Sequence, residues 1–162
     1  MGMKFGVYPM KSSEIFLADE VRAAEFGRHL GERLQAGHVV LLSGPVGAGK
    51  SHLSRAAIRH IVGAEIDVPS PTFTLVQTYD SPKGEIWHAD LYRLTDPSEA
   101  EELGLLEAME NAIVLIEWPD RLGSDRPQEA LNIELSYHGE GRHLTLTAPE
   151  ALLDHLLSGF QP

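Results

Sequence analysis

The fold of this chain is decided by the stretch Gly44-Pro45-Val46-Gly47-Ala48-Gly49-Lys50-Ser51. It fits the pattern G-x-x-x-x-G-K-[ST] of a phosphate-binding loop (P-loop). An apolar, β-branched run precedes it at residues 38–43, and a helix-like segment follows at residues 50–62. Such a loop requires a buried parallel strand before it and a helix N-terminus after it. The sequence therefore predicts a protein that binds nucleoside triphosphates.

Each residue type in this loop has a chemical task. Glycines at positions 44, 47 and 49 allow the backbone to curl around a phosphate with its N–H groups pointing inward. The helix N-terminus adds partial positive charge. We expect Lys50 to contact the β- and γ-phosphates and the Ser51 hydroxyl to ligate the Mg²⁺ that accompanies the nucleotide. The predicted nucleotide contacts of this segment are Gly44, Val46, Gly47, Ala48, Gly49, Lys50, Ser51 and His52.

Outside the loop, predicted helices alternate with predicted strands. We expect helices from Asp19 to about Gln35, over Lys50–Val62, from Asp96 to about Leu103 and from Pro149 to Leu157. We expect strands at residues 38–43, from about Phe73, from Glu85 to Tyr92 after a turn at residues 81–84, at residues 112–116, and as a hairpin of residues 130–137 and 142–148. The predicted fold class is α/β: one P-loop NTPase-like domain over residues 1–162, with a mostly parallel central sheet flanked by helices and a C-terminal β-hairpin.

The composition excludes several kinds of function. The 162 residues contain no cysteine, which excludes disulfides and thiol chemistry, and the eight histidines lack the spacing of a zinc site. With 24 acidic against 13 basic residues the net charge is −11, so we expect no tight direct binding to RNA. Residues 1–11 lack the apolar core of a signal peptide, and no apolar run is long enough to span a membrane. We therefore expect a cytoplasmic protein that does not bind membranes.

A carboxylate follows the most strand-like run of the chain. Glu117 ends the apolar segment at residues 112–116, where P-loop enzymes place an acid that positions Mg²⁺ or its water. Trp118 comes next, and its ring suits shielding of the site and plain packing equally well. Arg55 lies on the same side of the predicted helix as Ser51, where pairing with a neighbouring acid is favoured over phosphate contact.

Two other segments carry polar groups. Ser70-Pro71-Thr72-Phe73-Thr74 lies where many P-loop enzymes keep a segment that senses the γ-phosphate, although its composition also fits a surface turn. His88, Asp90 and Tyr92 alternate and share one face of a strand. A His and an Asp there can hold Mg²⁺ or orient a water, but this pattern alone favours solvated strand residues. The acidic run at residues 99–102 is typical of a solvated helix face.

Four ordered blocks, GPVGAGKS, SPTFTLVQTY, HADLYRL and VLIEWPDRLG, resemble the bacterial TsaE family, formerly called YjeE. The resemblance extends from about Asp19 to Arg142. It implies a small ATPase of tRNA threonylcarbamoyladenosine biosynthesis that assists the TsaB and TsaD proteins. These proteins transfer threonylcarbamoyl to an adenosine beside the anticodon, so that tRNA is reached through the complex.

The resemblance also implies roles for individual residues. Ser51 and Glu117 match the magnesium ligands, Asp90 a catalytic or metal-proximal acid, Thr72 a switch segment, and Trp118 the tryptophan after the acid. The adenine is expected near Asp19 and Glu20 and near Gly141 and Arg142. This chain departs from the family pattern at Pro45-Val46, where Asp-Leu is common, at Ser51, where Thr is usual, and at Asp120, where Glu is frequent.

The sequence thus predicts a Mg²⁺-dependent ATP hydrolase that binds ATP and ADP, with Lys50, Asp90 and Glu117 as its catalytic residues. Lys50 would hold the phosphates and Asp90 would orient the attacking water. A small-molecule kinase is the alternative enzyme, although no arginine-rich lid segment appears in the sequence. A nucleotide-gated adaptor that does not hydrolyse ATP is the non-enzymatic alternative.

Overall fold

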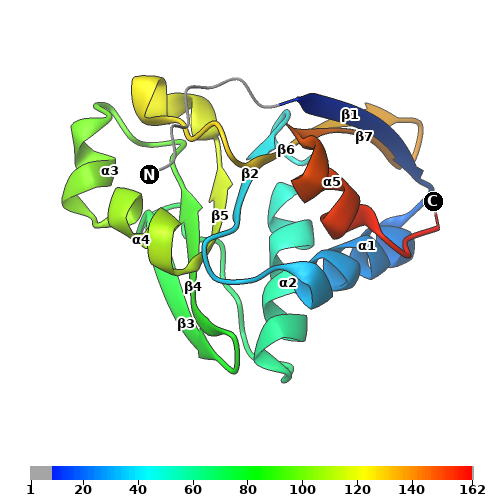
Figure 1. Ribbon diagram of the computed structural model, residues 1–162, viewed down its shortest axis with the longest axis horizontal. Helices are drawn as coiled ribbons and strands as arrows, with labels where there is room; N and C mark the ends of the chain where they lie inside the picture. The colour runs from blue at the N-terminus through cyan, green and yellow to red at the C-terminus, as the bar shows by residue number, and fades with distance from the viewer. Residues whose placement is uncertain (1–8, 162) are drawn as a thin grey trace.

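A single mixed sheet carries the P-loop at its centre (Figure 1). The computed structural model describes residues 9–161, and within them the strand order is β1-β7-β6-β2-β5-β4-β3. The strands are β1 (Met10–Leu17), β2 (Val39–Ser43), β3 (Val76–Ser81), β4 (Gly84–Asp90), β5 (Ile113–Glu117), β6 (Leu131–His138) and β7 (Gly141–Pro149). The helices are α1 (Glu20–Arg33), α2 (Lys50–Val62), α3 (Ser98–Glu102), α4 (Leu105–Asn111) and α5 (Glu150–Leu157), with a 3₁₀ segment η1 (Pro119–Asp125).

The four central strands β6, β2, β5 and β4 are parallel, and antiparallel strands flank them on both sides. All five residues of β5 and the first four of β2 are buried, because helices cover both faces of the sheet. Val40 and Leu42 face the core formed with α1, α2 and α5, whereas Val39 and Leu41 face the core formed with α3, α4 and η1. Successive side chains of β2 therefore pack into two separate cores, one on each face of the sheet.

Helices α1 and α2 pack closely through two glycines. A Cβ atom at Gly27 would lie 2.7 Å from the Cβ of Ala56, and one at Gly31 would lie 2.8 Å from the carbonyl oxygen of Ala57. Lys83, in the β3–β4 turn, lies at the C-terminal end of α1. Its Nζ donates to the carbonyl oxygens of Gly31, Glu32 and Leu34. These contacts fix α1 beside the helix that follows the P-loop.

The structure confirms the predicted fold class and most of the predicted elements, including the hairpin β6–β7 and the turn between β3 and β4. The strand expected from Phe73 begins only at Val76, because Leu75 N–H closes a turn onto the Pro71 carbonyl at 2.7 Å. Strand β4 ends at Asp90 rather than Tyr92.

Helix boundaries differ by one or two residues from the predicted ones. Helix α1 ends at Arg33, before Gln35, and α3 begins at Ser98 with Pro97 rather than Asp96 as its N-cap. Three elements were not predicted at all, namely β1, α4 and η1. Within residues 9–161, no helix combines the length and apolar character needed to cross a bilayer.

Candidate functional site

The P-loop connects the carboxyl end of β2 to the first turn of α2. Gly44, Gly47 and Gly49 all have positive φ angles, of 141°, 83° and 108°. This backbone region favours glycine. A Cβ at Gly44 would also lie 2.5 Å from the carbonyl oxygen of Leu135 in β6. The glycines of the motif are therefore required by the shape of the loop and by its close approach to β6.

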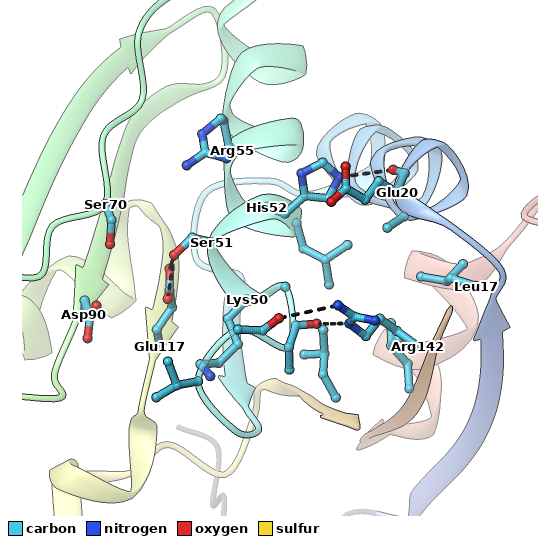
Figure 2. Close-up of a pocket in the computed structure, with 18 of the residues that line it drawn as sticks. Leu17, Glu20, Lys50, Ser51, His52, Arg55, Ser70, Asp90, Glu117 and Arg142 are labelled. Carbon is cyan, nitrogen blue, oxygen red and sulfur yellow. Dashed lines mark hydrogen bonds between the residues drawn. The ribbon is translucent and has the colours of Figure 1, made fainter. Parts of the chain in front are cut away.

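A cavity of about 730 Å³ opens beside the loop (Figure 2). Every predicted site residue except Gly44 lines it: Asp19, Glu20, Val46, Gly47, Ala48, Gly49, Lys50, Ser51, His52, Thr72, Asp90, Glu117, Trp118, Gly141 and Arg142. Gly44 lies beneath the loop, where its carbonyl oxygen accepts from Lys50. The sequence motifs therefore converge on one cavity, at the carboxyl ends of the parallel strands.

Lys50 is buried beneath the loop, with its side chain directed along the cavity wall. Its Nζ donates to the carbonyl oxygens of Gly44 at 2.6 Å and Pro45 at 2.9 Å, and lies 4.4 Å from the centre of the Trp118 ring. Burial lowers the pKa of Lys50 from its ordinary value, while the carboxylates of Glu117 and Asp90 oppose this change. The site thus holds a lysine cation between carbonyl oxygens and an aromatic face.

A hydrogen-bonded chain of three side chains, of which Glu117 and His88 are buried, runs from α2 across β5 to β4. The Ser51 hydroxyl donates to Glu117 Oε1 and Oε2 at 3.0 and 3.1 Å, and His88 Nε2 lies 2.7 Å from Glu117 Oε2. Glu117 is 2% exposed and His88 is 1% exposed. Figure 2 shows the Ser51 and Glu117 side chains facing each other. The predicted pair of Ser51 and Glu117 is thus in direct contact.

Asp90 lies next to Glu117 in the register of β4 and β5. Its Oδ2 accepts from the Thr72 hydroxyl at 3.1 Å, and the Thr72 and Ser70 hydroxyls are 2.9 Å apart. The Asp90 side chain is 5% exposed, so the interpretation of His88 and Asp90 as solvated strand residues is wrong. Asp90 contacts the Ser70–Thr72 turn and His88 contacts Glu117 on the neighbouring strand, and a strand pattern alone reveals neither contact.

Tyr92 and Trp118 form one wall of the cavity. Tyr92 lies beyond the end of β4, where its N–H donates to Asp90 Oδ1 at 3.0 Å. Its ring centre is 5.0 Å from that of Trp118. Trp118 has a φ angle of +61°, which is uncommon for a residue other than glycine, and its N–H donates to the Leu42 carbonyl. This backbone conformation directs the ring across the end of the sheet toward Lys50.

The opposite wall contains the residues assigned to the adenine by resemblance. Asp19 caps α1 by accepting from the N–H of Arg22 at 2.8 Å, and the Glu20 carbonyl lies 3.1 Å from His52 Nε2. Arg142 Nε donates to the carbonyl oxygen of Ala48 at 2.9 Å. The Arg142 guanidinium therefore contacts the main chain of the loop, as Figure 2 also shows.

Sequence reasoning missed the apolar part of the cavity. Five of its lining residues, together with Glu140, were not proposed: Leu17, Ala23, Leu53, Leu135 and Leu144. The alternation of the apolar residues Ile15 and Leu17 in β1 is the signal that could have indicated Leu17. Arg55 and Ser70, which were considered but not assigned, line the cavity as well.

The family model and the related sequences indicate the same family. Residues 17–144 match the family model described as threonylcarbamoyl adenosine biosynthesis protein TsaE. A tRNA threonylcarbamoyladenosine biosynthesis protein TsaE from Rickettsia bellii is 35% identical over 135 residues, covering 83% of this chain and 94% of that protein. Its counterpart from Haemophilus influenzae is 34% identical over 157 residues, covering 93% and 99%.

A solved structure shows the same fold. The crystal structure of YdiB from Bacillus subtilis matches with a TM-score of 0.74 and 24% identity, covering 92% of this chain and 96% of that chain. The family model covers every cavity-lining residue from Leu17 to Leu144. This chain therefore belongs to the TsaE family of tRNA threonylcarbamoyladenosine biosynthesis proteins.

Proposed function

We propose that this protein binds ATP with Mg²⁺ and hydrolyses it to ADP, in the cytoplasm, in support of threonylcarbamoyladenosine formation on tRNA by TsaB and TsaD. The observation that carries the proposal is the contact between the first-turn hydroxyl of Ser51 and the buried carboxylate of Glu117 beside the P-loop. A nucleotide-binding loop alone serves many activities. A hydroxyl and a strand-end carboxylate together are typical of NTP hydrolysis.

The residues present fit a magnesium ion. Mg²⁺ prefers oxygen ligands and few protein carboxylates. Ser51 and Glu117 supply a hydroxyl and a carboxylate in contact, and Asp90 adds a second carboxylate on the neighbouring strand. When bound, Mg²⁺ would neutralise charge on the phosphates and polarise them. We assign Ser51 and Glu117 as the metal-holding residues.

The chain's own groups account for the remaining requirements of phosphoryl transfer to water. Lys50 is a buried cation beside the loop, suited to the β- and γ-phosphates. Asp90 is fixed by the Thr72 hydroxyl and can orient an attacking water. Thr72 lies in a turn rather than a strand, so γ-phosphate can reposition this segment without disrupting the sheet.

TsaB and TsaD are part of the proposal because the chain resembles the TsaE family, and the charge of the chain bears only on how tRNA is reached. At a net charge of −11, the surface as a whole repels a tRNA backbone. We therefore expect tRNA to be bound by TsaB and TsaD, with this protein acting on them. Catalysis here is positioning and charge neutralisation, with no covalent intermediate on this chain.

The test is phosphate release from ATP by the purified protein, alone and with TsaB and TsaD, with Lys50→Ala as the blank. Glu117→Gln should bind ATP but release phosphate at the blank rate. Glu134→Gln, at an exposed carboxylate of β6, is the matched control and should equal the wild type. Wild-type rates in Glu117→Gln would refute the assignment.

The same preparations separate the alternatives. ATP-dependent binding to TsaB and TsaD without phosphate release above the blank would indicate an adaptor. Transfer of labelled γ-phosphate to a small-molecule acceptor, in place of release to water, would indicate a kinase.

A further inference from the structure

Two side chains of the β6–β7 hairpin hold the main chain of the P-loop from outside. The Tyr137 hydroxyl donates to the carbonyl oxygen of Val46 at 2.9 Å. Arg142 Nε donates to the carbonyl oxygen of Ala48 at 2.9 Å, and Nη2 reaches that of Gly47 at 3.5 Å. Consecutive carbonyl groups of the loop are thus directed toward the hairpin.

The orientation of these carbonyl groups fixes the orientation of the amides that follow them. In a planar trans peptide the C=O and the next N–H point in opposite directions. The bond from Tyr137 to Val46 therefore turns the Gly47 N–H away from the hairpin, and the bond from Arg142 to Ala48 does the same for the Gly49 N–H. Both glycines line the cavity, where inward amides bind phosphate oxygens. The Ala48 amide instead closes a turn onto the Pro45 carbonyl.

The loop and the hairpin are also fitted to each other sterically. A Cβ at Gly47 would lie 2.8 Å from the Tyr137 hydroxyl oxygen, so the hydroxyl rests directly on a glycine. The Arg142 guanidinium lies 4.6 Å from the centre of the Tyr137 ring and donates to the carbonyls of Glu140 and Gly141. Tyr137 and Arg142 are thus themselves held in place by neighbouring groups, and their bonds to the loop restrict the motion of its backbone.

We propose that Tyr137 and Arg142 are positioning residues, which pre-orient the amides of Gly47 and Gly49 for the phosphates of a nucleoside di- or triphosphate. The proposal rests on the proposed function for its ligand. It also replaces the assignment of Arg142 to the adenine, because the guanidinium donors are directed at main-chain carbonyls. Neither residue touches the reacting atoms in this role.

Tyr137→Phe and Arg142→Lys test the proposal. Tyr137 is 51% exposed, so loss of its hydroxyl leaves the core intact. We expect each variant to bind ADP about 3–10-fold more weakly, the usual effect of one lost hydrogen bond. Tyr79→Phe is the matched control, because the Tyr79 hydroxyl is buried without a hydrogen-bond partner among the described residues. Arg126→Lys is the second control, since Arg126 bonds Asn132 and does not line the cavity.

A nucleotide-free measurement distinguishes positioning from a general effect on folding. Backbone ¹⁵N relaxation should show the Gly47 and Gly49 order parameters falling from about 0.85 toward about 0.6 in both variants, with α2 unchanged. The Tm without nucleotide should stay close to that of the wild type. Lower order parameters with weaker ADP binding would support the proposal. Wild-type order parameters, or a lower Tm with wild-type ADP affinity, would overturn it.

The two proposals fail in different ways. If the wild-type protein binds neither ADP nor ATP, the proposed function is wrong. In that case the order parameters of the loop, which are measured without nucleotide, still test whether Tyr137 and Arg142 position the loop.

Discussion

The hydroxyl of Ser51 donates to both carboxylate oxygens of Glu117, at 3.0 and 3.1 Å, although 66 positions of sequence separate the two residues. The parallel sheet creates this contact, because β2 delivers the P-loop to the edge at which the neighbouring strand β5 ends. An ordinary α/β topology therefore assembles a hydroxyl and a buried carboxylate beside the same cavity.

Ser51→Ala should lower Mg²⁺-dependent phosphate release by at least about 10–100-fold, since even groups that only support a metal ligand cause losses of that size. Ser51→Thr keeps the hydroxyl and should retain most of the activity. The measurement is the initial rate against Mg²⁺ concentration for the three proteins. An unchanged Mg²⁺ dependence in Ser51→Ala would show that the hydroxyl does not hold the metal.

Gly27→Ala should destabilise the protein by about 1–3 kcal/mol, as overpacked contacts do. The added methyl would meet Ala56 at 2.7 Å, and this clash outweighs the gain of about 1 kcal/mol in helix propensity. Urea denaturation followed by circular dichroism measures the change. Arg28→Ala, at an exposed position of the same helix, is the control and should alter stability little. Equal or greater stability in Gly27→Ala would contradict the close packing of α1 on α2.

Lys83→Met should cost about 1–3 kcal/mol of stability, because it removes a cation that binds the last carbonyl groups of α1. The methionine keeps a similar length of apolar side chain. Lys11→Met removes an exposed ion pair with Asp154 and should cost less, since exposed pairs contribute little. Comparable urea midpoints for the two variants would refute the capping role of Lys83.

His29 should make folding sensitive to acid. Burial lowers the pKa of His29 from its ordinary value of 6.5, and the Arg33 charge acts in the same direction, against a hydrogen bond with the Leu156 main chain. At pH values between the lowered pKa of folded His29 and 6.5, the unfolded chain therefore binds more protons than the folded chain. The corresponding stability is present above that pH and is lost as the pH falls through the lower, folded-state pKa.

The variant His29→Gln removes this titration. Its Tm should fall less than that of the wild type between about pH 7.5 and about pH 5.5. Thermal denaturation at matched ionic strength measures the two slopes. Parallel slopes would exclude His29 as a source of acid sensitivity.

The sequence was sufficient for those parts of the fold that local signals determine. The P-loop motif predicted β2, α2 and the loop between them, and the Gly-rich turn predicted the β6–β7 hairpin. Strand β1 was not predictable in the same way, because it pairs with β7 at the other end of the chain, and only Ile15 and Leu17 of its residues are buried. Helix α4 follows directly from α3 after Gly104, without a side-chain cap that would mark its start.

The site shows the same division between local and long-range information. Its loop residues came from one motif, whereas the burial of His88 depends on Glu117, 29 positions away on the next strand. The contacts of Arg142 with the loop depend on the pairing of β6 with β2, which brings the hairpin beside the loop and leaves no local pattern in the sequence. Residues that act through a partner on another element were therefore the ones whose contacts local sequence patterns did not reveal.

The hairpin supports of the P-loop have a consequence for synthesis of the chain. Tyr137 follows Val46 by 91 positions, and Arg142 follows Ala48 by 94. During translation the loop and α2 leave the ribosome long before either support exists. A nascent chain that has completed the whole nucleotide-binding motif still lacks the groups that hold its backbone in place. The phosphate cradle is thus among the last parts of the molecule to be completed, even though its motif lies in the first third of the sequence.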